Sequence, residues 1–321
     1  MTVRSAVAGR TVLITGSTDG LGRELAVRLA VEGARVLVHG RDAGRAEEVR
    51  DRIREATAGA GFGSGADSGP GSGSGPRSGS GSGPRSGSRS GAGAGCGSAE
   101  VLLADLADLR AVDRLADEIL ARHDRLDVLI NNAGLGGGPP GSARQESADG
   151  YELRFAVNYL AGYRLTRRLL PLLTRSAPAR VVNVASVGQQ ALDFTDVMLE
   201  RGYDRSRAYA QSKLAQIMFT FDLADELDPA AVFVGALHPA TYMATTMVRE
   251  AGVAPWSTVE EGVEAVLHLL AASARGVPSG RYFNGTEESR ADAQAYDAQA
   301  RRRLRELSGD LVARALAPGR A

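Results

Sequence analysis

The chain has 321 residues and no formal net charge, because 38 basic residues balance 38 acidic ones. This balance argues against a nucleic-acid partner, which is generally bound by a basic face. Hydrophobic residues make up 43% of the chain, enough for a sizeable core in one large α/β domain or two small ones. No apolar run is long enough to span a membrane.

The N-terminus and the cysteine content indicate a cytoplasmic protein. The N-terminal MTVRSAVAGR lacks the apolar region of a signal peptide, and we expect it to lead straight into a strand. Cys96 is the only cysteine, so no disulfide can form within the chain. The sequence indicates no metal site.

Short apolar runs alternate with helical patterns along the chain. Strands are predicted at residues 11–15, 35–39, 100–105, 127–132, 180–186, 232–238 and 281–284. Helices are predicted at residues 20–32, 42–57, 108–123, 149–175, 206–227, 258–274 and 290–316. Continuous apolar strands separated by helices imply a parallel sheet covered on both faces. The prediction is therefore a Rossmann-type, doubly wound α/β fold with its ligand at the carboxyl ends of the strands.

Residues 59–98 interrupt this pattern between the second helix and the third strand. They are almost entirely Gly, Ser, Ala, Pro and Arg, so they cannot bury enough apolar surface to offset their ordering entropy. We expect a disordered insertion in a single domain that spans residues 1–321. Nothing in the segment specifies a partner.

A glycine-rich turn with the spacing GxxxGxG follows the first predicted strand. Glycines here let the backbone approach a pyrophosphate, and the N-terminus of the following helix favours its negative charge. Turns use glycine in any case, so the position between a strand and a helix is what indicates a dinucleotide site. The residues expected at the cofactor are Gly16, Ser17, Thr18, Gly20, Leu21 and Gly22.

The ends of the next strands extend the predicted cofactor site. An enzyme that prefers NAD usually has an acid at the end of the second strand, and one that prefers NADP has a basic group. Here His39 stands where the acid is expected and Arg41 follows, which favours NADP, with NAD as the alternative. The alternative interpretation is that Arg41 is an ordinary solvated arginine with no role at the cofactor. Further contacts are expected from Asp105, Leu106, Asn132, Ala133 and Gly134. The amides of the NNAG segment can also brace neighbouring strands, or form a purely structural turn.

Tyr209 and Lys213 are four residues apart, a spacing that places both on one face of a helix. A free phenol has a pKa of about 10, and a nearby cation lowers it toward the range useful for acid–base chemistry. Lys213 is the only lysine among the 38 basic residues, so a chain that otherwise uses arginine keeps lysine at this position. Ser186 ends the fifth predicted strand, 23 positions before Tyr209.

The segments TGSTDGLG, NNAG, VNVAS, YAQSK and HPA resemble, in order and spacing, the short-chain dehydrogenase/reductase family. The resemblance implies hydride transfer between a nicotinamide cofactor and a small-molecule carbonyl or alcohol. It implies that Tyr209 is the general acid or base and that Lys213 lowers its pKa and holds the nicotinamide ribose, so both also contact the cofactor. Ser186 would hydrogen-bond the substrate oxygen, and Asn158 would anchor a water of the proton relay. Considered alone, Asn158 is a helix residue facing a neighbouring helix.

Within this family the chain is similar to the retinol-dehydrogenase-like branch. The stretch LERGYDRSRAYAQSKLAQ, the GRYFNG strand and the tail around QAYDAQARRRL carry this resemblance. The branch generally prefers NADP, in agreement with Arg41. The family usually has Pro-Gly after the sixth strand, whereas this chain has Pro239-Ala240. Pro239 and Thr241 are expected at the cofactor, and Thr245 is an alternative contact for the nicotinamide carboxamide.

Residues 240–257 are expected to form a lid over the substrate. They carry Met243, Met247 and the only tryptophan, Trp256. Adaptable apolar side chains suit a pocket for a bulky or lipophilic substrate, and packing of the lid onto the domain is the alternative.

The resemblance also bears on assembly and on competing functions. Family members often pair through two long helices, here residues 149–175 and 206–227, so a homo-oligomer is expected. A non-catalytic NADP-sensing protein and a scaffold that recruits partners through residues 59–98 are the alternatives. A sensor would typically lack the Tyr or the Lys, and both are present. A sugar-nucleotide epimerase fits the glycine spacing and the C-terminal length less well.

Overall fold

The structure is a computed structural model that describes residues 3–60, 97–271 and 276–317. The predicted disordered insertion therefore lies outside the described residues, except at its two ends. These ends belong to regular elements, because α3 spans Ala43–Ala60 and β3 spans Ser98–Leu103.

The described residues form one eight-stranded sheet in the order β3-β2-β1-β4-β5-β6-β7-β8. Neighbouring strands run parallel from β3 to β7, and only the pair of β7 and β8 is antiparallel. The strand order reverses between β1 and β4, and in such sheets ligands bind at the carboxyl ends of the strands beside this reversal. Besides β3, the strands are β1 (Thr11–Ile14), β2 (Arg35–Gly40), β4 (Val128–Asn131), β5 (Ala179–Val184), β6 (Val232–His238), β7 (Arg281–Asn284) and β8 (Glu287–Glu288).

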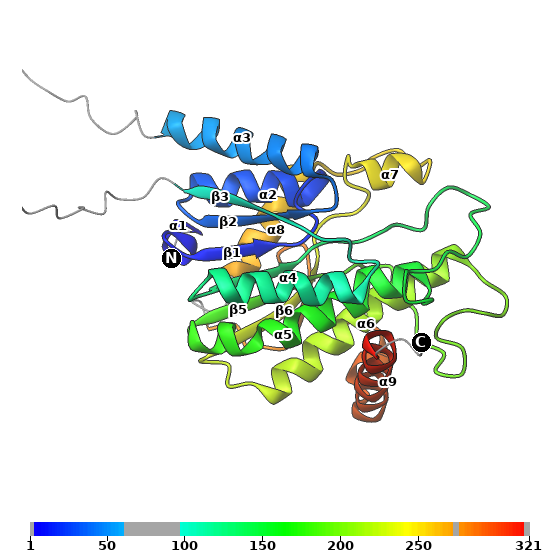
Figure 1. Cartoon of the computed structure of the whole chain (residues 1–321). Helices are drawn as coiled ribbons and strands as arrows, with labels where there is room; N and C mark the ends of the chain where they lie inside the picture. Colours follow the sequence, from blue (N-terminus) through cyan, green and yellow to red (C-terminus); the bar gives the residue numbers. More distant parts are fainter. Residues whose placement is uncertain (1–2, 61–96, 272–275, 318–321) are drawn as a thin grey trace, which may run out of the picture.

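Helices cover both faces of the sheet, which confirms the predicted doubly wound α/β fold (Figure 1). One face carries α1 (Val3–Val7), α2 (Gly20–Val31), α3 and α8 (Val259–Leu270). The other carries α4 (Leu109–Arg122), α5 (Ala161–Arg175) and α6 (Arg205–Glu226). A C-terminal helix, α9 (Ala298–Leu316), packs on α6 and α4.

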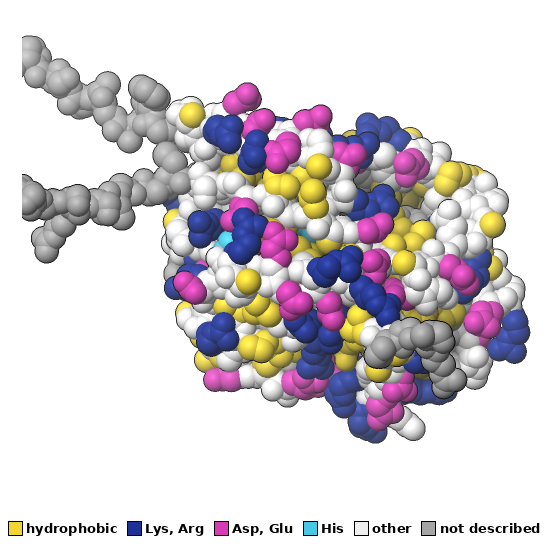
Figure 2. Space-filling view, in the orientation of Figure 1, with side chains coloured by type: hydrophobic (Ala, Val, Ile, Leu, Met, Phe, Trp, Pro, Cys, Tyr) yellow, Lys and Arg dark blue, Asp and Glu magenta, His cyan; other side chains and the backbone are white. Residues whose placement is uncertain are grey.

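The central strands β1, β4, β5 and β6 are largely apolar because both of their faces are buried. In β1, Val12 and Ile14 join the core under α2 and α8, whereas Leu13 joins the core under α4 and α5. All three side chains are fully buried, and each such burial contributes about 1.5–3 kcal/mol to folding. On the face that Figure 2 shows, basic and acidic side chains are interspersed. No helix of the described residues has the length and apolar character needed to cross a membrane.

The helix predicted at residues 149–175 begins later than expected. Glu152 forms an isolated bridge with Glu146, and the chain then enters a π-helix, η1 (Phe155–Leu160), that continues into α5. The Glu152 carboxylate accepts a hydrogen bond from the Phe155 amide at 2.7 Å, so it caps the helical segment. The upstream residues therefore stay out of the helix.

The predicted terminal helix at residues 290–316 is also interrupted. A short 3-10 helix, η3 (Ala293–Tyr296), ends at Asp297, whose side chain accepts hydrogen bonds from the first amides of α9. Such an N-cap fixes a new helix start, because it satisfies amides that have no partner within the helix. Three short elements were not predicted: α1, β8 and α7 (Thr246–Glu250).

Candidate active site

The glycine turn between β1 and α2 packs directly against the segment that follows β4. Gly16 has a φ of +64°, which favours glycine, and a Cβ there would lie 2.8 Å from the Ala133 Cα. A Cβ on Gly22 would lie 2.4 Å from the Gly16 carbonyl oxygen and 2.5 Å from the Asn132 Nδ2. Glycine is thus required at both positions for the two predicted cofactor segments to meet.

Thr15 ties the two segments together through hydrogen bonds. Its hydroxyl accepts from the backbone amides of Asn132 and Ala133, both at 3.0 Å. The Asn132 side-chain amide donates to the Thr15 carbonyl at 2.8 Å. Thr15 was not predicted as a site residue from the sequence, although it directly precedes Gly16. The Asn132 side chain therefore braces the glycine turn against the chain after β4. This bracing is one of the alternatives that the sequence left open for the NNAG segment.

Ser17 and His39 join the glycine turn to β2. The Ser17 hydroxyl accepts from the His39 amide at 2.9 Å, and the Gly16 amide donates to the His39 Nδ1 at 3.2 Å. Burial lowers the pKa of His39 to about 4, so its imidazole is neutral at pH 7. His39 thus occupies the position of the expected acid but packs inside the fold.

Arg41 and Asp105 lie on the surface where β2 and β3 end. The Arg41 guanidinium is 4.0 Å from the Asp105 carboxylate, and both side chains are more than half exposed. Exposed pairs of this kind contribute little to stability and are readily exchanged for another partner. Leu106, by contrast, is buried, and Thr18 packs against Gly40, where a Cβ would lie 2.4 Å from the Thr18 Cγ2.

Asp19 caps α2 at the end of the glycine turn, because its carboxylate accepts a hydrogen bond from the Gly20 amide at 2.7 Å. The next two amides of α2, those of Leu21 and Gly22, lie in its first turn, where amides have no partner within the helix. Such amides, with the helix dipole, favour a negative group. The turn therefore fits a pyrophosphate.

Tyr209 and Lys213 extend from α6 toward the carboxyl ends of β5 and β6. The Lys213 ammonium lies 5.8 Å from the centroid of the Tyr209 ring and is almost fully buried. It donates to the Val184 carbonyl and to the Gln216 Oε1, both at 2.9 Å. Ser186 and Tyr209 both flank Gly188, where a Cβ would lie 3.5 Å from the Ser186 Oγ and 3.7 Å from the Tyr209 Cε1. The structure thus brings three predicted catalytic residues together.

The electrostatics of this cluster differ from the expectation. Burial raises the pKa of Tyr209, and a hydrogen bond to Ser186 offsets part of this increase. Burial also lowers the pKa of Lys213 to about 7. A lysine that is only partly charged at neutral pH cannot strongly stabilise a phenolate. The predicted lowering of the Tyr209 pKa by Lys213 is therefore not found, because burial of both groups dominates.

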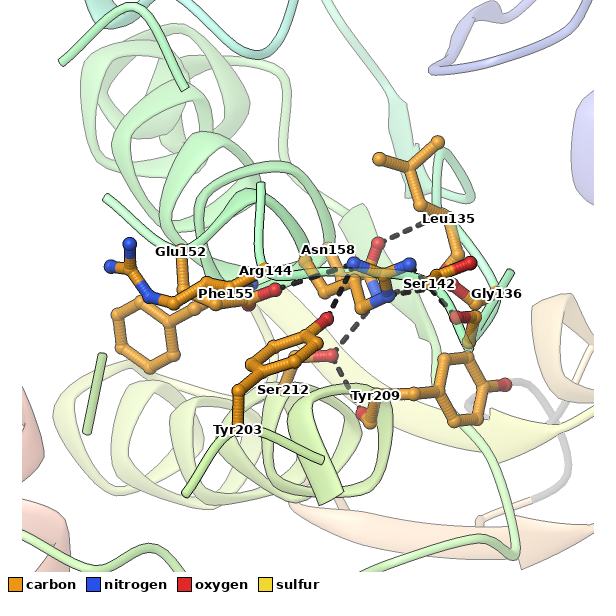
Figure 3. A network of polar contacts seen from close by, with 12 residues as sticks. Leu135, Gly136, Ser142, Arg144, Glu152, Phe155, Asn158, Tyr203, Tyr209 and Ser212 are labelled. Carbon is orange, nitrogen blue, oxygen red and sulfur yellow. Dashed lines mark hydrogen bonds and ion pairs between the residues drawn. The ribbon is translucent and has the colours of Figure 1, made fainter. Parts of the chain in front are cut away.

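Asn158 projects from η1 and contacts both α6 and the chain after β4 (Figure 3). Its Nδ2 donates to the Leu135 carbonyl at 3.0 Å and to the Ser212 hydroxyl at 2.9 Å. Its Oδ1 accepts from the Leu135 amide at 2.7 Å. The Ser212 hydroxyl in turn donates to the Tyr209 carbonyl at 2.7 Å. Asn158 thus faces a neighbouring helix, and both hydrogens of its side-chain amide are already used.

The family model for short chain dehydrogenases matches residues 10–67 and 91–255. The chain belongs to this family. The match leaves out residues 68–90, which lie within the predicted insertion. Retinol dehydrogenase 14 of Mus musculus is 34% identical over 318 residues, which cover 95% of this chain and 86% of the relative. Retinol dehydrogenase 14 of Homo sapiens is 35% identical over 319 residues with the same coverage. These relatives confirm the predicted similarity to the retinol-dehydrogenase-like branch.

Solved structures agree with this assignment. A protein from Mycobacterium paratuberculosis matches with a TM-score of 0.67 and 25% identity, covering 97% of both chains. The complex of Pseudomonas aeruginosa RhlG with NADP matches with a TM-score of 0.62 and 25% identity, covering 88% of this chain and 97% of the other. An Escherichia coli CFT073 short chain dehydrogenase complexed with NADPH matches with a TM-score of 0.61 and 25% identity, covering 88% and 98%.

In this short-chain dehydrogenase, buried amides brace the strands beneath the active site. The Asn131 Nδ2 donates to the Asn183 Oδ1 at 2.8 Å and to the Thr166 hydroxyl at 2.9 Å. The Asn183 Nδ2 donates to the Thr220 hydroxyl at 2.8 Å. These contacts link β4, β5, α5 and α6, and so fix the elements that carry the catalytic residues.

The chain after β6 approaches the glycine turn at Thr245. Pro239 is buried, and the Thr241 hydroxyl is 3.0 Å from the His238 Nε2. A Cβ on Gly20, which has a φ of +49°, would lie 3.0 Å from the Thr245 methyl group. Thr245 is therefore the threonine beside the glycine turn, whereas Thr241 is bonded to β6. His238 was not predicted, and burial lowers its pKa to about 4.

The apolar side chains of the predicted lid differ in their surroundings: Met243 and Met247 pack against the rest of the chain, whereas Trp256 is exposed. Met243 packs onto the domain, because a Cβ on Gly262 would lie 2.4 Å from its sulfur. Met247 covers Gly136, where a Cβ would lie 2.7 Å from the Met247 Cγ. Trp256 is 74% exposed and packs edge-on against Tyr242, with ring centroids 5.0 Å apart. For Met243, the structure therefore agrees with the alternative given by the sequence, in which the side chain packs onto the domain and does not line a substrate pocket.

Proposed function

We propose that this short-chain dehydrogenase is an NADP-dependent oxidoreductase that acts on a bulky, lipophilic carbonyl or alcohol. The observation that carries the proposal is the cluster of Ser186, Tyr209 and Lys213 beside a glycine turn that fits a pyrophosphate. NADP and NADPH complexes among the similar structures support the choice of cofactor. The retinol dehydrogenases among the relatives support a lipophilic substrate.

Each side chain has a defined task in this proposal. The nicotinamide cofactor supplies or accepts the hydride when bound. Tyr209 gives a proton to the substrate oxygen in reduction, and its raised pKa keeps the phenol protonated at neutral pH. Ser186 donates a hydrogen bond to the same oxygen. In its charged form Lys213 has three donors, of which two reach acceptors inside the fold and one is left for a sugar hydroxyl.

Arg41 is the proposed partner of the NADP 2′-phosphate. Arg41→Asp is expected to weaken NADPH binding about tenfold or more, because it removes a charge-assisted contact and adds repulsion. NADH affinity should stay unchanged or rise, because an acid at the end of the second strand suits the ribose hydroxyl of NADH. The matched control is Arg54→Asp, because Arg54 is 70% exposed and Arg41 69%. Fluorescence titration with both cofactors measures the effect. If the unmodified enzyme binds NADH as tightly as NADPH, the assignment of Arg41 is wrong.

Exposed apolar side chains mark the mouth of the proposed substrate pocket. Val187 follows Ser186, and Tyr242, Met247 and Trp256 belong to residues 240–257. Trp256→Ala is expected to raise KM for a long polyene aldehyde such as retinal about tenfold, since it removes a large apolar contact. KM for propanal should change little, and Val31→Ala, an exposed apolar residue at the end of α2, is the control. Equal changes for both aldehydes would contradict a lipophilic pocket.

Assembly and location are part of the same proposal. Two copies of the chain are not expected to pair through the helix predicted at residues 206–227. In the structure α9 packs on this helix, α6, and residues 211–223 are all buried within one chain. A homo-oligomer, which we still propose, would use a surface other than α6. Light scattering measures whether it forms. Cytoplasmic localisation is proposed from the sequence alone.

A further inference from the structure

The chain after β4 forms a wall beside the catalytic residues that is almost without side chains. We call residues 134–138 the glycine wall, because only Leu135 interrupts its four glycines. A Cβ on Gly134 would lie 3.3 Å from the Lys213 Nζ and 3.4 Å from the Asn158 Oδ1. Glycine backbone is intrinsically flexible, so the position of this wall depends on the groups that hold its carbonyls and amides.

Arg154 holds the middle of the glycine wall. Its Nε donates to the Gly136 carbonyl and its second terminal nitrogen, Nη2, donates to the Gly137 carbonyl, both at 2.9 Å. The guanidinium fork reaches two successive carbonyls, which the single ammonium of a lysine does not match. Asn158 holds the preceding residue, Leu135, from the same helical segment.

Arg154 is itself fixed from two sides, by Tyr203 and by Glu152. Its Nη1 donates to the Tyr203 hydroxyl at 2.9 Å and lies 3.5 Å from the Glu152 carboxylate. Glu152 is completely buried and caps the amide of Phe155 at the start of η1. Tyr203 lies in the chain that leads into α6. Arg154 therefore connects the glycine wall with the segments that carry Asn158 and Tyr209.

Stability alone does not explain a buried pair of this kind. Moving two charges out of water costs several kcal/mol, and replacing such a pair by well-packed apolar residues is often neutral or stabilising. The Arg154 side chain is 5% exposed and that of Glu152 is 0% exposed, so both bear this cost. What the pair provides is a defined conformation of a flexible backbone next to Lys213.

We propose that Arg154, held by Glu152 and Tyr203, is a positioning residue that sets the glycine wall and thereby aligns Asn158, Ser212 and Tyr209 for proton transfer. The inference rests on the proposed oxidoreductase function. Met247 contacts the wall at Gly136, so the same arrangement also supports the lid. A misplacement of about 1 Å in such a site can lower turnover about a hundredfold.

The test compares Arg154→Met, which keeps the length of the side chain, with Arg164→Met. Arg164 is the matched control, because it is bidentate to Asp113 between α5 and α4, away from the site. Hydrogen exchange of the amides of residues 133–138 is expected to accelerate about tenfold or more in Arg154→Met only. Turnover with NADPH and a reactive ketone should fall about tenfold to a hundredfold, whereas the dissociation constant for NADPH should change less than about threefold. Arg154→Lys should recover only a small part of the turnover.

Unchanged exchange in the glycine wall, or turnover close to that of the unmodified enzyme, would overturn the inference. If Arg154→Met does not fold, Tyr203→Phe decides instead: it should accelerate exchange in the wall and lower turnover about threefold, and a silent Tyr203→Phe counts against the proposal. If the unmodified protein reduces no carbonyl compound with NADPH, the proposed function fails, and hydrogen exchange still decides whether Arg154 positions the wall.

Discussion

Replacing Tyr209 by phenylalanine is expected to lower turnover about a thousandfold while NADPH binding stays almost unchanged. General acid–base catalysis by a positioned side chain contributes about 10²–10⁴-fold, and the variant removes only the hydroxyl that transfers the proton. The ring remains beside Ser186 and Gly188, so the shape of the site is kept. Because burial raises the pKa of Tyr209, carbonyl reduction by the unmodified enzyme should not decline between pH 6 and pH 8 through loss of the phenolic proton.

Tyr242→Phe is the matched control for this experiment. Tyr242 also acts electrostatically on Tyr209, and Tyr242 is 44% exposed. Its variant keeps the edge-on contact with Trp256 and should retain turnover within about twofold. Single-turnover kinetics separates the chemical step from cofactor binding. A Tyr209→Phe enzyme with more than about a tenth of the normal turnover would assign the acid–base role to another group.

Most of the sheet could be predicted because its central strands, β1, β4, β5 and β6, are buried on both faces and are therefore largely apolar. The termini of the helices were less predictable where a single side chain decides them. Glu152 ends the irregular chain before η1 by capping Phe155, and Asp297 separates η3 from α9. Nothing in the sequence distinguishes these two acids from the many acidic residues on exposed helix faces. Their effect depends on which amides the folded chain places within 3 Å.

Which groups of the candidate site lie together could be predicted where residue spacing alone decides it. Tyr209 and Lys213 share a face of α6, and the glycine turn necessarily lies between β1 and α2. Arg154 gave no comparable signal, because its partners Gly136 and Tyr203 are 18 and 49 positions away. The protonation states also depend on burial. The sequence suggests a charged lysine beside a phenol, whereas the folded chain lowers the pKa of Lys213 to about 7.

Replacing Lys213 by methionine should abolish most turnover and also remove a dependence of stability on pH. The pKa of lysine is 10.5 in the reference state and about 7 for Lys213 in the folded chain. Between these pH values the unfolded chain binds more protons than the folded one, so this group makes the free energy of unfolding rise with pH. The rise amounts to as much as about 5 kcal/mol over the full interval, and Lys213→Met should lack it.

Urea unfolding at pH 6.5, 8 and 9.5 tests this expectation. The methionine variant also leaves Val184 and Gln216 without their hydrogen-bond donor, but this loss is nearly independent of pH and cancels in the comparison of slopes. Parallel curves for the two proteins would show that Lys213 is charged in the folded state. Because Lys213 is the only lysine, ¹³C-lysine labelling gives one side-chain NMR signal, whose titration reads its pKa directly.

Lys213→Arg separates the need for charge from the need for lysine. Arginine is not deprotonated in proteins, so its charge would stay buried at every pH, and its planar fork does not fit the two acceptors that the ammonium uses. The arginine variant should therefore be less stable than the unmodified protein at neutral pH and should lose at least about nine-tenths of the turnover. Lys213→Arg should also bind NADPH more weakly. Tyr209→Phe, in contrast, should bind NADPH almost as tightly as the unmodified enzyme. Turnover near that of the unmodified enzyme in Lys213→Arg would mean that any buried cation suffices beside Tyr209.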